Sequence, residues 1–383
     1  MSSSKWQQAR NILCIRLDNM GDVLMCTPAM RALRALMPAR RITLLASGSG
    51  AAVAPFIAEI DEAIAYAPPW IKSSRPHDPD CDLRMAQLLR ERAFDAAVIF
   101  TTYSQSPLPA AMLCHLAGIP LRLAHCRENP YQMLTDWVPE PEPEQGVRHE
   151  VRRQLDLVTT VGCRTGNERL SFTVPEEDRA WVQRRLLAHG IGVRGKPWVL
   201  LHPGATAPSR RYPAAHWSRV VAMLAADGLD IVLTGDGSEA DLIASIMRDA
   251  GPVAATVHSM AGRLDLGRLG AAIALASAVV SNNTGPAHMA AAIGTPLVDL
   301  YALTNPQHTP WQVASRVLFH DVSCRFCYKS VCPQGHHDCL DKVAPAQVAA
   351  AVHGLLREAP DAHPCAAEVI SFRQWQERRA RRG

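Results

Sequence analysis

The sequence predicts an α/β protein with two domains, each organised around a parallel β-sheet. Short apolar runs of strand length alternate with helix-length amphipathic segments along most of the 383 residues, a pattern typical of βαβ units. The length favours two domains, at roughly 150 residues per domain. A segment rich in Pro and Glu at 138–144 separates two series of strand-like runs, because proline cannot continue a helix or a central strand.

Each series contributes its own strands and helices. The first series has strand-like runs at 12–17, 42–46, 63–66, 95–100 and 121–124. The second series has them at 198–202, 230–234, 278–282 and 297–301. The helices expected between and after these runs are 22–37, 83–92, 217–227, 239–250, 266–276 and 346–357.

Two more helices, at 149–161 and 175–189, lie between the two series. We place the domain boundary in this region, with an N-terminal domain at 1–175 and a C-terminal domain at 176–360. The rest of the chain, 361–383, is a basic tail. A charge run of this kind is usually a solvated helix end, and the alternative is attraction to anionic lipid or a phosphorylated acceptor at the inner membrane surface.

The composition is that of a soluble globular enzyme. Hydrophobic residues make up 48% and charged residues 20%, which excludes a disordered or fibrous chain. Lys and Arg number 40 against 36 Asp and Glu, and a formal net charge of +4 is too small to indicate nucleic-acid binding. The sequence contains neither a secretory signal nor an apolar run long enough to span a bilayer, so we expect a cytoplasmic protein.

One candidate site follows the first strand-like run. Parallel sheets bind ligands at the carboxyl ends of their strands, where helix N-termini present free N–H groups to anions. Gly21 allows close backbone approach at this junction, and Asp22 opens the next helix. Asp22 is interpreted either as a helix cap or as a carboxylate that accepts a proton at the ligand site.

A second junction follows the run at 278–282. Thr284 and Gly285 would expose a hydroxyl and backbone donors to a pyrophosphate, and Pro286 suits the first turn of a helix. His288 would lie one turn into that helix and point back towards the same site. The alternative interpretation is a capped turn with a buried histidine.

A third junction follows the run at 198–202. Thr206 can donate a hydroxyl there, and Arg210 or Arg211 can form a bidentate pair with a phosphate. A solvated arginine pair is the alternative. These two junctions together predict a phosphate site in the C-terminal domain.

A glycine motif raises a competing function. Gly235, Gly237 and Ala240 follow the run at 230–234 and match a variant of the dinucleotide fingerprint. A dehydrogenase normally carries this fingerprint on the first strand of its domain, whereas here the run at 198–202 comes earlier. The position therefore argues against a nicotinamide cofactor.

Taken together, these junctions resemble glycosyltransferase family 9, the heptosyltransferases that use ADP-heptose in building the lipopolysaccharide core. The first matching piece is Ile12-Leu-Cys-Ile-Arg-Leu-Asp-Asn-Met-Gly-Asp-Val, and the last is Asn283-Thr-Gly-Pro-Ala-His-Met. Between them, in order, lie the matching pieces 27–34, 149–157, 202–205, 210–213 and 234–239. The resemblance implies a GT-B architecture, in which two Rossmann-like domains with parallel sheets face a central cleft, with the acceptor on the N-terminal side and the nucleotide-sugar on the C-terminal side.

The resemblance also implies residue roles by position. Asp22 matches the general base of an inverting reaction that needs no metal or other cofactor. Arg210 matches a basic residue that contacts the donor phosphates, Thr206 a neighbouring hydroxyl contact, and Glu239 an acidic residue that binds the nucleoside. The contacts to the pyrophosphate and the sugar match three residues of the second junction: Thr284, Gly285 and His288.

Asn283 is a departure from the resembled family, which commonly has Asp at this position. An amide both donates and accepts hydrogen bonds, whereas a carboxylate only accepts them. The substitution therefore bears on the identity or the orientation of the donor sugar.

The sequence supports one main hypothesis, the transfer of heptose from ADP-heptose to a lipopolysaccharide inner-core acceptor. Two alternatives are the same donor chemistry on a protein or another glycan acceptor, and a nucleotide-sugar binding protein without catalysis. The expected partners are the nucleotide-sugar, the acceptor and, at most peripherally, the inner membrane, and we expect no nucleic acid.

Four of the 11 cysteines fall within the segment 324–339. Four thiolates on one short loop suit a tetrahedral structural metal, zinc or iron. Free thiols and labile disulfides are the alternatives, because the pattern lacks a second C-x2-C pair. The candidate ligands are Cys324, Cys327, Cys332 and Cys339.

Overall fold

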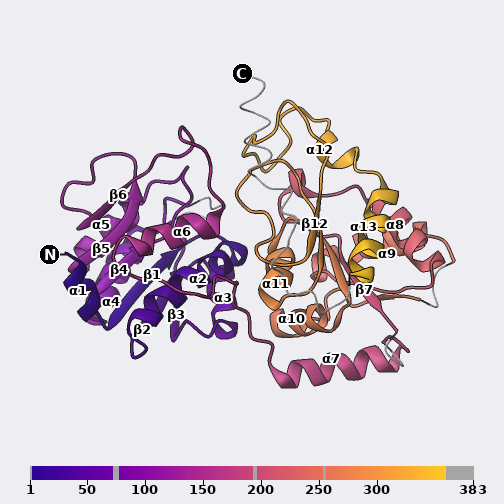
Figure 1. The fold of residues 1–383 in the computed structure, drawn as a ribbon, viewed down its shortest axis with the longest axis horizontal. Helices are drawn as coiled ribbons and strands as arrows, with labels where there is room; N and C mark the ends of the chain where they lie inside the picture. The colour runs from indigo at the N-terminus through magenta and orange to yellow at the C-terminus, as the bar shows by residue number, and fades with distance from the viewer. Residues whose placement is uncertain (1, 72–76, 193–195, 253–255, 359–383) are drawn as a thin grey trace. The chain divides into compact units, whose positions relative to one another are not determined.

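The computed structural model describes residues 2–71, 77–192, 196–252 and 256–358. The chain divides into two compact units, of which the first ends at Ser171 and the second begins at Phe172. Each unit contains a six-stranded parallel sheet covered by helices (Figure 1). Across these ranges no helix is both long enough and apolar enough to cross a membrane. The basic tail predicted at 361–383 lies outside the described residues.

The sheet of the first unit has the strand order β3-β2-β1-β4-β5-β6. Its strands are β1 (Asn11–Arg16), β2 (Arg41–Ala46), β3 (Glu62–Ala65), β4 (Ala96–Ile99), β5 (Leu121–Cys126) and β6 (Asp136–Pro139). Its helices are α1 (Ser2–Gln8), α2 (Met20–Leu36), α3 (Gly48–Val53), α4 (Pro79–Glu91), α5 (Leu108–Leu116) and α6 (Glu150–Thr159). Helix α2 packs with α3 and α6, while α4 packs with α5. The central strands are buried because helices cover both faces of the sheet, so their sequences are continuous apolar runs.

The sheet of the second unit has the strand order β12-β11-β10-β7-β8-β9. Its strands are β7 (Trp198–His202), β8 (Asp230–Leu233), β9 (Val257–Ser259), β10 (Ala278–Asn282), β11 (Leu297–Leu300) and β12 (Ser315–Leu318). Its helices are α7 (Glu176–Ala188), α8 (Ala214–Ala226), α9 (Ala240–Asp249), α10 (Leu266–Leu275), α11 (Gly285–Ile293), α12 (Asp338–Asp341) and α13 (Pro345–Arg357). Helix α10 packs with α7 and α11, while α8 packs with α9 and α13, and Figure 1 shows the sheet between these two groups.

Three edge strands were not predicted from the sequence pattern. Strands β6, β9 and β12 all lie at the edges of their sheets. Their burial alternates or is partial, and β9 has only three residues. An edge strand needs less apolar surface than a central one, so its sequence gives a weaker signal. The Pro-rich segment at 138–144 begins at the end of β6, which is consistent with proline being tolerated at a sheet edge.

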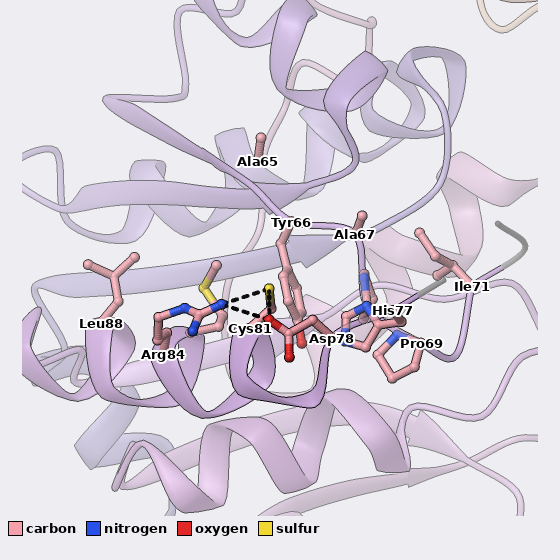
Figure 2. A pocket seen from close by; sticks show the side chains of 12 residues that line it. Ala65, Tyr66, Ala67, Pro69, Ile71, His77, Asp78, Cys81, Arg84 and Leu88 are labelled. Carbon is pink, nitrogen blue, oxygen red and sulfur yellow. Dashed lines mark hydrogen bonds and ion pairs between the residues drawn. The ribbon is translucent and has the colours of Figure 1, made fainter. Parts of the chain in front are cut away.

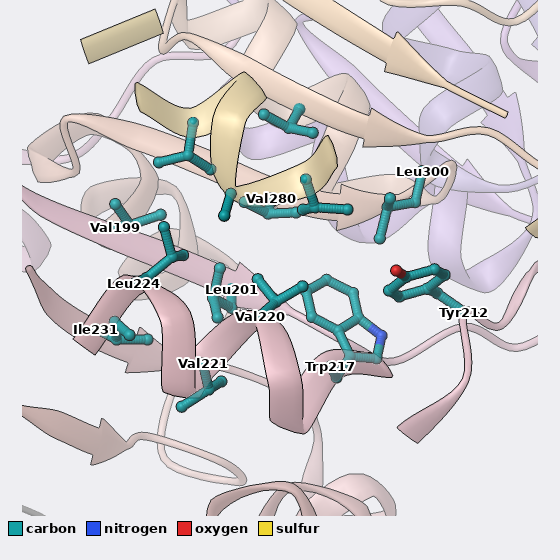
Figure 3. Close-up of a cluster of buried hydrophobic side chains, with 14 of the residues drawn as sticks. Val199, Leu201, Tyr212, Trp217, Val220, Val221, Leu224, Ile231, Val280 and Leu300 are labelled. Carbon is teal, nitrogen blue, oxygen red and sulfur yellow. The ribbon is translucent and has the colours of Figure 1, made fainter. Parts of the chain in front are cut away.

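The core of the second unit fixes the loop that follows β7. Trp217 of α8 is completely buried in a hydrophobic cluster that also contains Val199 and Leu201 of β7 (Figure 3). Tyr212 meets Trp217 edge to face, with ring centroids 5.7 Å apart, and donates its hydroxyl to the carbonyl of Val343 at 2.7 Å. Each side chain of this size contributes on the order of 2–3 kcal/mol through burial. The loop from β7 to α8 is therefore anchored at the end that leads into α8.

Both sheets change the direction of strand addition next to their first strand. From β1 the chain adds β2 and β3 on one side and then β4 on the other, and from β7 it adds β8 and β9 and then β10 in the same way. The carboxyl ends of β1 and β4, and those of β7 and β10, are thus topological switch points. Ligands of open α/β sheets bind at such points.

Candidate active site

The predicted phosphate site lies at the switch point of the second unit. Asn282, at the end of β10, donates its Nδ2 to the carbonyls of Pro203 at 2.8 Å and Gly204 at 3.3 Å, both in the loop after β7. From the same loop, Arg210 donates its Nη1 to the backbone oxygen of Asn283 at 3.4 Å. The loops after β7 and β10 are thereby tied together, and residues predicted from two separate motifs become neighbours.

The N-terminus of helix α11 is suited to an anion. The helix begins at Gly285 directly after β10, Pro286 lies in its first turn as predicted, and Thr284 is its N-cap residue. The Thr284 hydroxyl donates to the carbonyl of Asn282 at 3.2 Å, and within the described part of the chain no side chain caps the helix. The uncapped N–H groups and the positive end of the helix dipole favour a negative charge at this point.

Arg210 is half-buried beside this helix, whereas Thr206 is exposed in the same loop. The preceding residue, Ser209, donates its backbone N–H to the carbonyl of Ser330 at 3.0 Å and its hydroxyl to the carbonyl of Lys329 at 2.8 Å. The cysteine-containing loop thus holds the backbone next to Arg210. A guanidinium fixed in this way beside a helix N-terminus can bind a phosphate through two parallel hydrogen bonds.

Glu239 packs against the backbone of Gly204. A Cβ atom on Gly204 would lie 1.8 Å from Oε1 of Glu239, so only glycine leaves room for this carboxylate. The backbone N–H of Asp236 donates to Oε2 of Glu239 at 3.0 Å, and burial raises the pKa of Glu239. Gly235 also makes room for Glu239, because a Cβ atom there would lie 2.8 Å from Oε2. This close packing gives Gly235 a role that does not involve a dinucleotide.

Two buried polar residues belong to the segment that forms the predicted phosphate site. His288 of α11 is buried, and its ring meets the ring of His308 edge to face at 6.5 Å. Asn283 is also buried and donates its Nδ2 to Oδ2 of Asp299 and to the carbonyl of His308, each at 3.0 Å. The position at which the resemblance implied a carboxylate therefore holds an amide with a carboxylate neighbour.

The first unit has a cluster of charged side chains at its own switch point. Arg16, the last residue of β1, is completely buried. Its guanidinium contacts Oδ2 of Asp18 at 2.9 Å, Oδ1 of Asp22 at 3.1 Å and Oε1 of Glu150 at 2.6 Å. Gln154 also donates to Oε1 of Glu150, at 2.8 Å. One buried cation is thus shared by three carboxylates, which come from the loop after β1, from α2 and from α6, and this leaves the cluster with an excess of negative charge.

Asp22 is the third residue of α2, and Asn19 takes the N-cap position. Asp22 therefore does not occupy the N-cap position, but it takes part in capping the helix, because its side chain forms a capping box with Asn19. Its Oδ2 accepts the backbone N–H of Asn19 at 3.1 Å, while its Oδ1 faces Arg16. Its side chain is 16% exposed. The carboxylate is therefore held at both oxygens and still reaches the surface of the unit.

Asp18 is a second carboxylate in the same cluster. Gln105, from the loop after β4, donates its Nε2 to Oδ1 of Asp18 at 2.7 Å. Burial raises the pKa of Asp18, with Asp22 and Glu150 acting in the same direction and Arg16 opposing them. The loops after β1 and β4 thus meet at this residue.

A cavity of about 640 Å³ opens near the carboxyl end of β3 in the first unit. Tyr66 donates its hydroxyl to Oδ1 of Asp82 at 2.5 Å, and Nε2 of His77 lies 2.8 Å from the same oxygen. Arg84 reaches across to Asp78 and Cys81 (Figure 2). The cavity lies at the same edge of the sheet as Asp22, since parallel strands share their carboxyl ends.

The four cysteines of the 324–339 loop lie within electrostatic reach of one another. Burial raises the pKa of Cys339, and the thiols of Cys332, Cys324 and Cys327 raise it further. The Cys324 Sγ lies 3.7 Å from Nε2 of His336. As placed, however, no three His, Cys, Asp or Glu side chains among the described residues form a group that holds a metal ion.

The model of the family described as glycosyltransferase family 9 (heptosyltransferase) matches residues 83–337. The chain belongs to glycosyltransferase family 9. Lipopolysaccharide heptosyltransferase 2 of Salmonella typhimurium is 25% identical over 356 residues, which cover 91% of this chain and 99% of that protein. The family 9 resemblance predicted from the sequence is therefore confirmed, and the protein is a glycosyltransferase.

Solved structures agree with the GT-B fold predicted for a family 9 enzyme. The crystal structure of the family 9 glycosyltransferase from Veillonella parvula has a TM-score of 0.77 and 21% identity, covering 91% of this chain and 98% of that one. The dodecameric iron-containing heptosyltransferase TibC, solved with ADP-D-β-D-heptose, has a TM-score of 0.51 and 14% identity, covering 91% and 77%. The two six-stranded parallel sheets, each covered by helices, confirm the two predicted Rossmann-like domains.

The motifs of family 9 did not reveal every residue of the two clusters. Arg16, Asp18, Glu150 and Asp299 were not singled out from the sequence. A usable signal was present for Arg16 and Asp299, because each is a charged residue within an otherwise apolar strand. A charge buried in a central strand requires a partner, so both positions could have been identified in advance.

Proposed function

We propose that this enzyme transfers heptose from ADP-heptose to an acceptor of the lipopolysaccharide inner core. The observation that carries the proposal is the uncapped N-terminus of α11 beside Arg210, at the switch point of a family 9 enzyme. This arrangement is suited to a diphosphate. The choice of heptose and of the lipopolysaccharide acceptor is supported by the likeness to the Salmonella typhimurium enzyme along 91% of the chain.

In the proposal the second unit binds the donor. The first-turn N–H groups of α11, together with Thr284 and Gly285, bind the pyrophosphate, and Arg210 contacts the same phosphates with Thr206 nearby. The chemical purpose is to stabilise the negative charge that develops on ADP as the bond to the sugar breaks. Glu239 accepts hydrogen bonds from the ribose hydroxyls. We assign the sugar-facing side of the site to two further residues, Asn283 and His288.

In the proposal the first unit activates the acceptor. Asp22 takes the proton of the acceptor hydroxyl while its oxygen attacks the anomeric carbon, and ADP leaves from the opposite face, so the configuration inverts. Arg16 and the backbone N–H of Asn19 hold the carboxylate in place. The chemistry assigned to these residues uses no cofactor.

A screen of donors tests this proposal. Thermal unfolding is recorded with ADP-heptose and with GDP-, UDP- and dTDP-sugars, and the expected result is stabilisation that is largest with ADP-heptose. Preference for another nucleotide would refute the specific donor while leaving the family unchanged. Turnover with a lipopolysaccharide core precursor, compared with protein and other glycan acceptors, then tests the acceptor. Donor binding without turnover on any acceptor would favour the non-catalytic alternative.

We also propose that the four cysteines at 324–339 bind a structural zinc or iron ion. Thiolates are the soft ligands that both metals accept, and the other three cysteines all raise the pKa of Cys339. Elemental analysis of the purified protein tests this, since less than about one-tenth of an equivalent of any transition metal would refute it. Contact with the inner membrane through the basic tail stays a proposal, which binding to anionic vesicles would test.

A further inference from the structure

Asn283 has its side-chain amide committed to the protein interior. Both partners of its Nδ2 are hydrogen-bond acceptors: Oδ2 of Asp299 and the carbonyl oxygen of His308, each at 3.0 Å. An amide nitrogen has two hydrogens, and these two bonds use both of them. The orientation of the amide is therefore dictated by chemistry, because turning it over would place its oxygen against two acceptors.

This orientation leaves Oδ1 of Asn283 as the atom free to face the other way. The backbone of Asn283 accepts a hydrogen bond from Arg210, and the next residue begins the N-terminal turn of α11. A carbonyl oxygen at this position can only accept hydrogen bonds. The Asn283 amide therefore retains one acceptor that carries no negative charge.

Asp299, on the neighbouring strand, accepts one of the two hydrogen bonds that orient the Asn283 amide. It is completely buried in β11, beside β10 in the sheet, and its Oδ1 has no hydrogen-bond partner among the described residues. Burial raises the pKa of Asp299 to about 7, against the opposing effects of the Asn283 hydrogen bond and the Arg210 charge. Because burying a carboxyl group is costly, a functional role explains its presence here better than packing does.

We propose that Asp299 is a positioning residue of the donor site, which holds the Asn283 amide with its oxygen towards the nucleotide-sugar. The inference rests on the proposed function, because it assumes that the donor binds at the N-terminus of α11. Asp299 itself touches no substrate in this scheme.

Four variants test the assignment by steady-state kinetics with ADP-heptose. Asp299→Leu removes the acceptor, and we expect kcat/KM to fall about tenfold or more. Asp299→Asn keeps an acceptor oxygen, so it should stay within about threefold of the parent enzyme. Asn283→Asp removes the two amide hydrogens and leaves at most the proton of Asp299 to be shared among three acceptors, so we expect a fall of about 30-fold or more. The exchange of both residues, N283D with D299N, restores a donor between them and should recover at least about tenfold of that loss.

Recovery in the exchange variant separates positioning from a merely structural role. A structural role would make kcat/KM follow thermal stability across the variants, whereas positioning predicts losses of kcat/KM in folded proteins that do not follow their melting temperatures. Asp230→Asn is the matched control, because this largely buried carboxylate lies at the amino end of β8, away from the carboxyl ends of the strands, and pairs with Lys196 at 2.7 Å. It should leave the kinetics unchanged.

Two results overturn the inference while sparing the proposed function. One is an Asp299→Leu enzyme with parental kinetics, and the other is an exchange variant no better than Asn283→Asp. A parent protein that neither binds ADP in calorimetry nor uses ADP-heptose would instead refute the proposed function, and the inference with it.

Discussion

The buried carboxyl of Asp299 should make the stability of the protein depend on pH in a defined direction. Its pKa is about 7 in the folded protein, against an ordinary value of 3.8, because burial disfavours the charged form. The folded state thus holds the proton more tightly than the unfolded state does. The stabilisation from this difference is fully present below the ordinary pKa, declines as the pH rises, and is lost above the folded-state pKa.

The size of the effect follows from these two pKa values. Between about pH 5 and about pH 8 the parent protein should lose about 2.5 kcal/mol of unfolding free energy from this one group. Two titratable groups interact with it: Arg210, whose charge lowers the pKa of Asp299, and the phenol of Tyr301, whose own pKa is raised by burial and by Asp299. The Asp299→Asn variant has no titrating group at this position, so its loss over the same range should be smaller by that amount.

Urea unfolding of both proteins at several pH values measures the difference. The quantity to plot is the unfolding free energy of Asp299→Asn minus that of the parent, which should rise with pH and level off above about pH 7. Two parallel pH profiles would refute the reasoning. A difference that falls with pH would show that the folded protein favours the charged carboxylate.

Three other substitutions address the two clusters. Asp22→Asn should lower kcat by about 10²–10⁴-fold with an unchanged Kd for ADP, and full activity would exclude Asp22 as the base. Arg16→Met leaves buried carboxylates unpaired and should destabilise the protein by about 3–5 kcal/mol in urea unfolding, so parental stability would contradict the shared-cation description. Gly204→Ala places a Cβ atom 1.8 Å from the Glu239 carboxylate and should raise the Kd for ADP about tenfold, whereas Gly237→Ala, with open space around its Cβ position, should not.

The glycine motif at Gly235 shows how a local pattern acquires its meaning from packing. From the sequence, this motif matched a dinucleotide fingerprint with an unusual place in the domain. The structure shows that Gly235 and Gly204 both make room for the Glu239 carboxylate. The spacing of the glycines was visible in the sequence, but the packing of Glu239 against Gly204, which lies in another loop, was not.

The sequence by itself determined the two parallel sheets and the places where the chain crosses from strand to helix. Strands β7 and β10 were predicted with their exact bounds, because a parallel strand buried on both faces must be a continuous apolar run. The turn residues Thr284, Gly285 and Pro286 could be identified in the same way, since helix starts depend on neighbours in sequence. Edge strands such as β9 lacked this signal.

Only the tertiary structure decided which polar groups meet. Arg16 and Glu150 are separated by 134 positions and Asn283 and His308 by 25, and no local pattern records either pairing. Strand order brings these residues together, because the carboxyl ends of parallel strands meet at one edge of a sheet. A charged residue in a buried strand indicates that a partner exists, but only the fold determines which residue that partner is.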